Sequence, residues 1–412
     1  TCNINCNSDP GLSKIFMTPH KTHILFLDTN DAMGGVVQVH LNLLRTLNRQ
    51  KLRVTLACHP RGMVIDKFRG VRQLHPLPVN AGTKSSRHCQ SRLSPIYDLV
   101  SIGLLSAAVL KLLRYCRRYR VDVIYTSDKK RSVLVSYFLS CLTGLPVIYH
   151  CHSVYVDYKI NRWLLRNAAA VIANSNAVKD DFIRQGGSQM HAIKVIHNGL
   201  DEQLYSPASN STLRGDLGVD ADHVLIGVTA RLAPEKGQDV FLKAAARVVE
   251  QTKKVRFIIV GDTSIYSDNA NYVEYLHSLV QRLRLQNHVI FTGFRQDMVN
   301  VYRGLDVVVD PAWLEPFGMV VIEPMACGRV VVGTDKGGIP EIIRHGENGF
   351  LFPPGDEQAL AQVLLYILNN RRECCLRLAK RARQTVLERF TIARQTQQLE
   401  EILLDIAQGN EA

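Results

Sequence analysis

Short runs of almost only apolar residues recur along the chain and alternate with helical patterns. The runs cover residues 23–27, 54–57, 123–125, 147–149 and 171–173 in the first half, and 224–228, 256–260, 289–292, 307–309 and 330–332 in the second. Each run is followed by a polar or glycine-containing loop, and then by apolar residues spaced as on one helix face. Fully apolar strands that alternate with helices indicate parallel sheets covered on both faces. The pattern therefore predicts the α/β class, with doubly wound sheets.

A polar, proline-containing segment at residues 206–212 interrupts this pattern near the middle of the chain. Segments of this kind link domains, and a chain of 412 residues is long enough for two. We expect two Rossmann-like domains, residues 21–205 and 206–390, that face a central cleft. Their ligands would bind beyond the carboxyl ends of the strands. Residues 1–20 are expected to form a flexible N-terminal extension.

The composition narrows the class of protein further. Hydrophobic residues make up 46% of the chain and charged residues 21%, as in ordinary globular domains. No run of about 20 apolar residues is present and the first sixteen residues are polar, so we expect neither a membrane-spanning helix nor a secretory signal. The ten cysteines form neither a Cys-x-x-Cys pair nor a zinc-binding pattern. We therefore expect a cytoplasmic, reducing location.

Positive charge is concentrated in residues 84–131. The formal net charge of the chain is +13, and this segment has eleven Lys or Arg residues against three Asp residues. Apolar residues at helical spacing over 99–116 favour either a helix packed on a sheet, with a solvated basic face, or a basic amphipathic helix at an anionic membrane surface. Few aromatic residues are interspersed and no nucleic-acid motif is present, so nucleic acid is not expected as a partner.

Two glutamates that stand eight positions apart, Glu315 and Glu323, flank a predicted helix start. Pro316 and Gly318 favour a turn, and a helix beginning near Gly318 or Met319 would offer backbone N–H groups to a phosphate. Glu315 would lie at the mouth of this site, where its carboxylate can accept hydrogen bonds from sugar hydroxyls. Glu323, inside the helix, could reach a ribose. The alternative is a surface helix with two solvated glutamates.

Two cationic residues, Arg231 and Lys236, lie in a loop between the predicted strand 224–228 and a helix that begins near Gly237. A guanidinium fork and an ammonium point charge at a strand end suit a diphosphate. The alternative is a pair of surface charges that are neutralised by Glu235.

Three other strand ends carry candidate residues. Gly34 and Gly35 open a helix after the first strand and allow close approach of a ligand, although the Gly-x-Gly-x-x-Gly fingerprint is absent. His152 follows the strand 147–149 and could position a sugar hydroxyl or move a proton. The sequence His-Cys-His at 150–152 has two histidines but no evident third ligand, so a metal site is not expected there. The sequence Gly293-Phe294-Arg295 could hold a nucleobase or only cap its strand.

Taken in order, these motifs resemble those of the family 4 glycosyltransferases, which have the GT-B fold. The resemblance extends from residue 21 to residue 405. It is most specific in the Glu-x7-Glu region, Glu-Pro-Phe-Gly at 315–318 with Glu-Pro-Met-Ala-Cys-Gly at 323–328, and in residues 337–341 and 346–351. Residues 231–237 add support.

The resemblance implies a role for each of these positions. Arg231 and Lys236 neutralise the diphosphate of the donor, and His152 and Glu315 contact the donor sugar, so these four are the expected catalytic residues. Glu323 binds ribose. The remaining donor-binding residues are expected to be Gly34, Gly35, Gly293, Phe294, Arg295, Phe317, Gly318, Met319 and Val320.

The resemblance also implies the reaction. A hexose is transferred from a nucleotide-diphosphate sugar, most commonly a UDP-sugar, to a hydroxyl acceptor with retention of configuration, and neither a metal nor a cofactor is required. The acceptor can be lipid-linked, a glycan or a small polyol, and residues 391–412 are expected to cross back to the first domain as a helix. Two alternatives remain: a nucleotide-sugar epimerase or hydrolase of the same fold, and a non-catalytic protein that binds a nucleotide sugar or a membrane.

Overall fold

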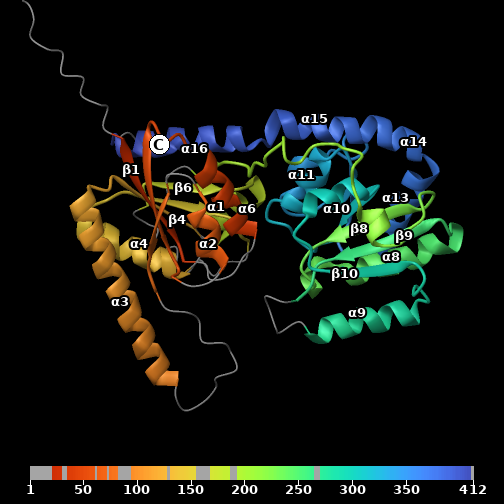
Figure 1. Ribbon diagram of the computed structural model, residues 1–412, viewed down its shortest axis with the longest axis horizontal. Coiled ribbons are helices and arrows are strands. Elements are labelled where there is room, and N and C mark those ends of the chain that lie inside the picture. Colours follow the sequence, from red (N-terminus) through yellow and green to blue (C-terminus); the bar gives the residue numbers. More distant parts are fainter. Residues whose placement is uncertain are drawn as a thin grey trace, which may run out of the picture.

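The computed structural model has two lobes that lie side by side, each built around one parallel sheet (Figure 1). The structure describes residues 21–29, 35–60, 63–71, 74–81, 94–127, 130–154, 168–185, 193–263 and 270–409. The expected extension 1–20 and Gly34 therefore lie outside the described residues. Within them, no helix combines the length and the apolar character that are needed to cross a membrane.

The first sheet has seven strands in the order β3-β2-β1-β4-β5-β6-β7, and every neighbouring pair is parallel. Its strands are β1 (Thr22–Asp28), β2 (Leu52–Cys58), β3 (His75–Pro78), β4 (Val123–Ser127), β5 (Val147–Cys151), β6 (Ala170–Ala173) and β7 (Ile193–Val195). The helices of this lobe are α1 (Gly35–Thr46), α2 (Met63–Arg69), α3 (Ser94–Tyr119), α4 (Lys130–Thr143) and α6 (Asn176–Arg184).

The central strand β1 shows why helices cover both faces of this sheet. Ile24 and Phe26 belong to one apolar core, together with residues of α1 and α2. Leu25 and Leu27 point to the opposite face and pack with residues of α3 and α4. Because successive side chains of a strand alternate between faces, an apolar run of this kind buries both faces at once.

The second sheet has six parallel strands in the order β10-β9-β8-β11-β12-β13. Its strands are β8 (Val224–Thr229), β9 (Val255–Val260), β10 (Val289–Gly293), β11 (Val307–Asp310), β12 (Val330–Thr334) and β13 (Phe350–Phe352). The helical segments are α7 (Leu213–Asp216), η2 (Pro234–Lys236), α8 (Gln238–Gln251), α9 (Ala270–Arg282), α10 (Met298–Gly304), α11 (Met319–Ala326), α12 (Ile339–Ile342), α13 (Glu357–Asn369), α14 (Arg371–Glu373), η4 (Cys374–Leu378) and α15 (Ala379–Arg389).

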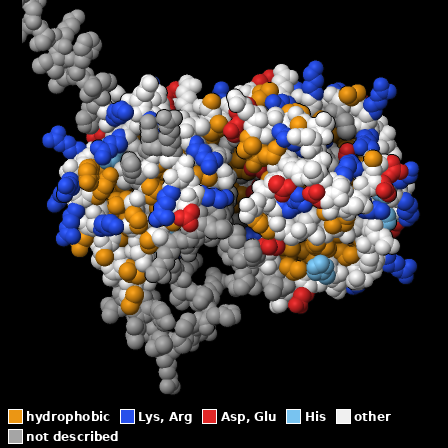
Figure 2. Space-filling model, viewed as in Figure 1, with side chains coloured by type: hydrophobic (Ala, Val, Ile, Leu, Met, Phe, Trp, Pro, Cys, Tyr) orange, Lys and Arg blue, Asp and Glu red, His pale blue; other side chains and the backbone are white. Residues whose placement is uncertain are grey.

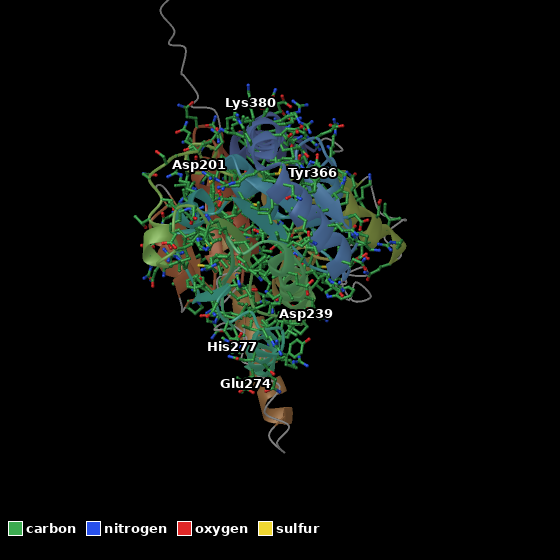
Figure 3. All side chains as sticks on the ribbon, turned by 90° about the vertical axis from the view of Figure 1, so that its right-hand side faces the viewer. Asp201, Asp239, Glu274, His277, Tyr366 and Lys380 are labelled. Atoms are coloured by element: carbon green, nitrogen blue, oxygen red, sulfur yellow. The ribbon has the colours of Figure 1, made fainter. Side chains whose placement is uncertain are left out.

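Helices enclose the second sheet as well. Figure 3 views this lobe from outside, with Glu274 on α9, Tyr366 on α13 and Lys380 on α15. The α/β class with two doubly wound parallel sheets, predicted from the apolar runs, is therefore confirmed.

The last helix, α16 (Ile392–Ala407), connects the C-terminal end of the chain to the first lobe. Its buried residues Leu399, Ile402 and Leu403 belong to the same core as Ile24 of β1. Thr391 caps the helix by accepting a hydrogen bond from the backbone N–H of Arg394. The domain boundaries at 205/206 and 390/391 stay predictions.

Candidate functional site

The candidate donor site lies at the carboxyl ends of β8 and β11, which are neighbours in the second sheet. The backbone N–H of Trp313 donates to the carbonyl of Glu235 (3.1 Å), which ties the loop after β11 to the loop after β8. Gly237 has a φ of +65°, and a Cβ at this position would overlap the carbonyl oxygen of Pro311. Only glycine fits here, because both the positive φ and the close approach exclude a side chain.

This close packing brings Lys236 against Glu315, and the two side chains form an ion pair. Their side chains are 22% and 11% exposed, so the pair is mostly buried. Burial lowers the pKa of Lys236, but the carboxylates of Glu315 and Asp310 outweigh this effect, and the net pKa is raised. The ammonium is therefore charged at neutral pH, and an entering diphosphate can share it with Glu315.

Two further charged groups flank this pair. Arg231 donates to Glu235 (2.6 Å), which is the surface pairing considered as the alternative, and its side chain is 34% exposed. Asp310 ends β11 and is buried, and the burial together with the nearby Glu315 raises its pKa to about 7. The sequence analysis did not single out Asp310, although a carboxylate at the end of an apolar strand is a detectable signal.

The turn and helix predicted after Glu315 are present. Helix α11 begins at Met319, and its N-cap Gly318 has a φ of +117°, a conformation that other residues rarely adopt. No side chain of the described residues caps this end, so the helix start presents backbone N–H groups. Phe317 is buried and contacts the ring of Phe390 (centroids 5.7 Å apart), so its ring belongs to the core and the donor contact predicted for this residue is left to its backbone.

Glu323 lies inside α11 and is held by two tyrosines that the sequence analysis did not find. The hydroxyl of Tyr302 donates to its Oε2 (2.9 Å), and Tyr205 also hydrogen-bonds to the carboxyl. Burial raises the pKa of Glu323 to about 7 against the opposing effect of both hydroxyls. The Tyr302 hydroxyl lies 3.2 Å from the hydroxyl of Thr229 at the end of β8, which places Glu323 beside the same strand end as the two cations.

The residues proposed for the nucleobase follow β10. Gly293 ends this strand with a φ of +68°, and Phe294 is 61% exposed. Arg295 donates to Asp216 (2.9 Å) and Asp297 (2.6 Å), so its guanidinium is engaged by two carboxylates. A flat ligand can reach the Phe294 ring more directly than the guanidinium, and the role of all three residues stays a prediction.

In the first lobe, His152 follows β5 and is buried. Its ring stacks on His150 (centroids 4.0 Å apart) and meets the edge of His40 (5.4 Å). Asp28 at the end of β1 accepts a hydrogen bond from Nδ1 of His40 (2.7 Å), in a pair with no solvent exposure. Burial, followed by the two neighbouring histidines, lowers the pKa of His152 well below its usual range, so the ring is neutral. Sequence reasoning missed Asp28 and His40.

Hydrogen bonds connect this part of the first lobe to the donor loop. Asn174 Nδ2 donates to the carbonyl of His152 (3.3 Å), and the next residue, Ser175, donates to the carbonyl of Pro316 (2.5 Å). Gly35 begins α1 at the same edge of the first sheet, after β1. The structure thus brings His152 and the loop that carries Glu315 onto neighbouring segments, although they belong to different sheets.

One group of acidic and histidine side chains in the described residues has the spacing of metal ligands: Asp220, Asp222 and His223. These residues precede β8 and lie at its amino end, opposite to the carboxyl end where Lys236 and Glu315 meet. The positive groups at the candidate donor site among the described residues include Arg231, Lys236 and the start of α11.

Models of two glycosyltransferase families match this chain, one in each half. The model of the family described as Glycosyltransferase Family 4 matches residues 33–204, and that of the family described as Glycosyl transferases group 1 matches residues 209–385. The site residues that were predicted from the sequence, from Gly34 to Glu323, lie within these two ranges.

Individual relatives agree with the family models. The D-inositol 3-phosphate glycosyltransferase of Corynebacterium jeikeium is 31% identical over 82% of this chain and 83% of that protein. The N-acetyl-alpha-D-glucosaminyl L-malate synthase of Bacillus anthracis is 28% identical over 52% of this chain and 54% of that protein. The chain spans about half the length of several curated relatives that it matches. Among solved structures, Anabaena Alr3699/HepE in complex with UDP-glucose has a TM-score of 0.79 and 28% identity, with 93% of this chain and 99% of that one covered.

Proposed function

Because the chain belongs to the group 1 glycosyltransferases, we propose that it transfers a hexose from a UDP-sugar to a hydroxyl acceptor, with retention of configuration and without a metal ion. The observation that carries this proposal is the Lys236–Glu315 pair, which sits beside Arg231 and the open start of α11. This arrangement offers positive charge to a diphosphate and a carboxylate to sugar hydroxyls within one small site. The likeness to HepE, whose structure holds UDP-glucose, supports a UDP-sugar as the donor.

The chemistry requires that charge developing on the leaving diphosphate be stabilised. Arg231, Lys236 and the backbone N–H groups at the start of α11 can supply this stabilisation from preorganised positions. Glu315 accepts hydrogen bonds from the donor sugar, and Glu323 accepts them from the ribose. The neutral ring of His152 contacts the sugar from the first lobe, and the two lobes close around the donor.

We assign a front-face course to the transfer. The bond between the anomeric carbon and the diphosphate oxygen breaks, and the acceptor oxygen bonds to the same face of that carbon. The acceptor proton passes to an oxygen of the departing diphosphate, so UDP leaves and no covalent sugar–enzyme intermediate is required. Lys236 and Arg231 hold the diphosphate on that face throughout.

The acceptor is proposed to be presented at an anionic membrane surface. Val100, Ile102 and Leu110 of α3 are more than half exposed, and Leu142 of α4 is half exposed. Four exposed basic residues share α3 with them, Lys111, Arg114, Arg117 and Arg118, and the exposed Arg120 directly follows the helix. Figure 2 shows hydrophobic and basic side chains together on the lobe where Figure 1 places α3 and α4. Apolar and basic groups on one helix suit the interface of an anionic bilayer.

Transfer from radiolabelled UDP-glucose, in the presence of a chelator, tests the proposal. Candidate acceptors are anionic vesicles containing lipid-linked sugars, oligosaccharides and polyols, and the anomeric configuration of any product is read by NMR. An α-linked product formed from UDP-glucose in chelator supports retaining, metal-independent transfer. An inverted product, or activity that appears only after Mg²⁺ is added, contradicts it.

A further inference from the structure

Glu341, on the short helix α12 of the second lobe, is bound almost entirely by groups of the first lobe. Its Oε2 accepts from the backbone N–H of Asn176 (3.0 Å), the side-chain amide of Asn176 (2.8 Å) and Nε2 of His197 (2.9 Å). Its Oε1 accepts from the backbone N–H of Ala177 (2.9 Å). One carboxylate therefore receives four hydrogen bonds from the other lobe.

The backbone groups among these donors are the first N–H groups of α6. A helix start leaves four backbone N–H groups without an intrahelical partner. The N-cap Ser175 accepts from the third, that of Val178 (3.1 Å), while Glu341 accepts from the first two. The N-terminus of this nine-residue helix is thus completed by the opposite lobe, with a carboxylate at the positive end of the helix dipole.

The same contact reaches the donor loop. The hydroxyl of Ser175, which caps α6, also donates to the carbonyl of Pro316. The backbone N–H of Gly338 donates to the carbonyl of Glu315 (2.8 Å), and a Cβ at Gly337 would overlap that carbonyl oxygen. The segment 337–341 therefore contacts both parts. Gly337 and Gly338 pack against the backbone of Glu315, and Glu341 binds the start of α6.

We propose that Glu341 is a positioning residue, which docks helix α6 of the first lobe onto the second lobe and thereby sets the loop of Glu315 against the acceptor side of the site. The ionised carboxylate fits this role: burial raises the pKa of Glu341, but the hydrogen bonds from His197 and from the N–H groups of α6 outweigh it and lower the pKa. The inference rests on the proposed function, because Glu315 matters for transfer only if a sugar donor binds there.

Glu341→Gln, which keeps the shape but removes the charge, tests the docking. The matched control is Glu347→Gln, since Glu347 lies on the same segment but is mostly exposed and pairs with Arg344 of its own lobe (3.7 Å). Small-angle X-ray scattering measures the radius of gyration. We expect a larger radius for Glu341→Gln than for the wild type and the control, because the lobes are no longer held together at α6.

Kinetic measurements distinguish a positioning role of Glu341 from a role in the stability of the fold alone. With UDP-glucose as donor and water as acceptor, we expect UDP release by Glu341→Gln to fall by about ten-fold, the loss typical of one hydrogen bond to a charged group. The Kd for UDP should stay within about two-fold, because most of the proposed nucleotide contacts, those of Arg231, Lys236 and Glu323 among them, lie in the second lobe. Ser175→Ala, which removes the contact to Pro316 and the side-chain N-cap of α6 but keeps Glu341, should shift turnover in the same direction if Glu341→Gln does not fold.

The outcomes are distinguishable. An unchanged radius with unchanged turnover overturns the inference, and so does a loss of UDP affinity as large as the loss of turnover, since that pattern marks a damaged fold. If the wild type neither binds UDP nor releases it from UDP-glucose, the proposed function fails, whereas the scattering comparison still decides whether Glu341 docks the lobes.

Discussion

Protonation of Glu323 is expected to control donor binding near neutral pH. Its carboxyl is buried against Tyr302 and Tyr205, and its pKa is raised from 4.5 to about 7. In the proposed ribose contact, the ionised carboxylate offers two acceptor oxygens to the ribose hydroxyls, whereas protonation turns one of these oxygens into a donor. With a pKa of about 7, about one tenth of the carboxyl is ionised at pH 6 and about nine tenths at pH 8. The affinity for UDP-glucose should therefore rise about ten-fold between these two pH values.

Isothermal titration of UDP-glucose at pH 6, 7 and 8 measures this effect. UDP-glucose is preferred to UDP, because a terminal phosphate ionises near pH 6 and would add its own pH dependence. Glu323→Gln is the control: it keeps the contribution of Asp310, whose pKa is also about 7. The difference between the two curves belongs to Glu323. Equal affinities at pH 6 and 8, or the same rise in Glu323→Gln, would refute the reasoning.

The same pKa has a consequence for stability with a definite sign. Because the folded-state pKa is above the unfolded value of 4.5, the folded state binds more protons between pH 4.5 and pH 7, and stability falls as the pH rises through this window. A shift of this size corresponds to about 3 kcal/mol in the free energy of unfolding. Urea unfolding of Glu323→Gln should show a shallower decline between pH 5 and pH 7 than the wild type.

Three further outcomes are expected. Lys236→Ala and Glu315→Ala should each abolish sugar transfer while circular dichroism stays native, and full activity in either variant would contradict the site assignment. Thr391→Ala should lower the free energy of unfolding by about 1 kcal/mol, measured by urea titration, because it removes the N-cap of α16. Replacing Arg114 and Arg118 by Glu should reduce flotation with phosphatidylserine vesicles and leave turnover of UDP-glucose in solution unchanged; undiminished flotation would remove the support for membrane docking.

All interior strands of both sheets and the edge strand β10 could be predicted from the sequence, and the other three edge strands could not. Every apolar run named in the sequence analysis is a strand of the structure. The missed strands, β3, β7 and β13, lie at sheet edges. An edge strand has one neighbour and needs few apolar residues, so its pattern is weak; β3 even contains two prolines, which interior strands rarely tolerate.

Within the candidate site, features that depend on neighbouring residues could be predicted from the sequence, whereas contacts between distant segments could not. The start of α11 at Met319 follows from Pro316 and Gly318, because a turn and a glycine N-cap act over a few residues. The contacts of Glu323 with Tyr205 and of Glu341 with α6 join segments more than a hundred residues apart. No periodicity encodes such pairs, since they depend on how the two lobes come together.

Calorimetric titration of the wild type and Lys236→Ala with UDP-glucose in a chelator is the measurement to make first. The Lys236–Glu315 pair predicts saturable binding to the wild type without metal, and a large loss of affinity when the ammonium is removed. Equal binding by the two proteins, or binding that requires added Mg²⁺, would contradict a donor site built on Lys236 and Glu315.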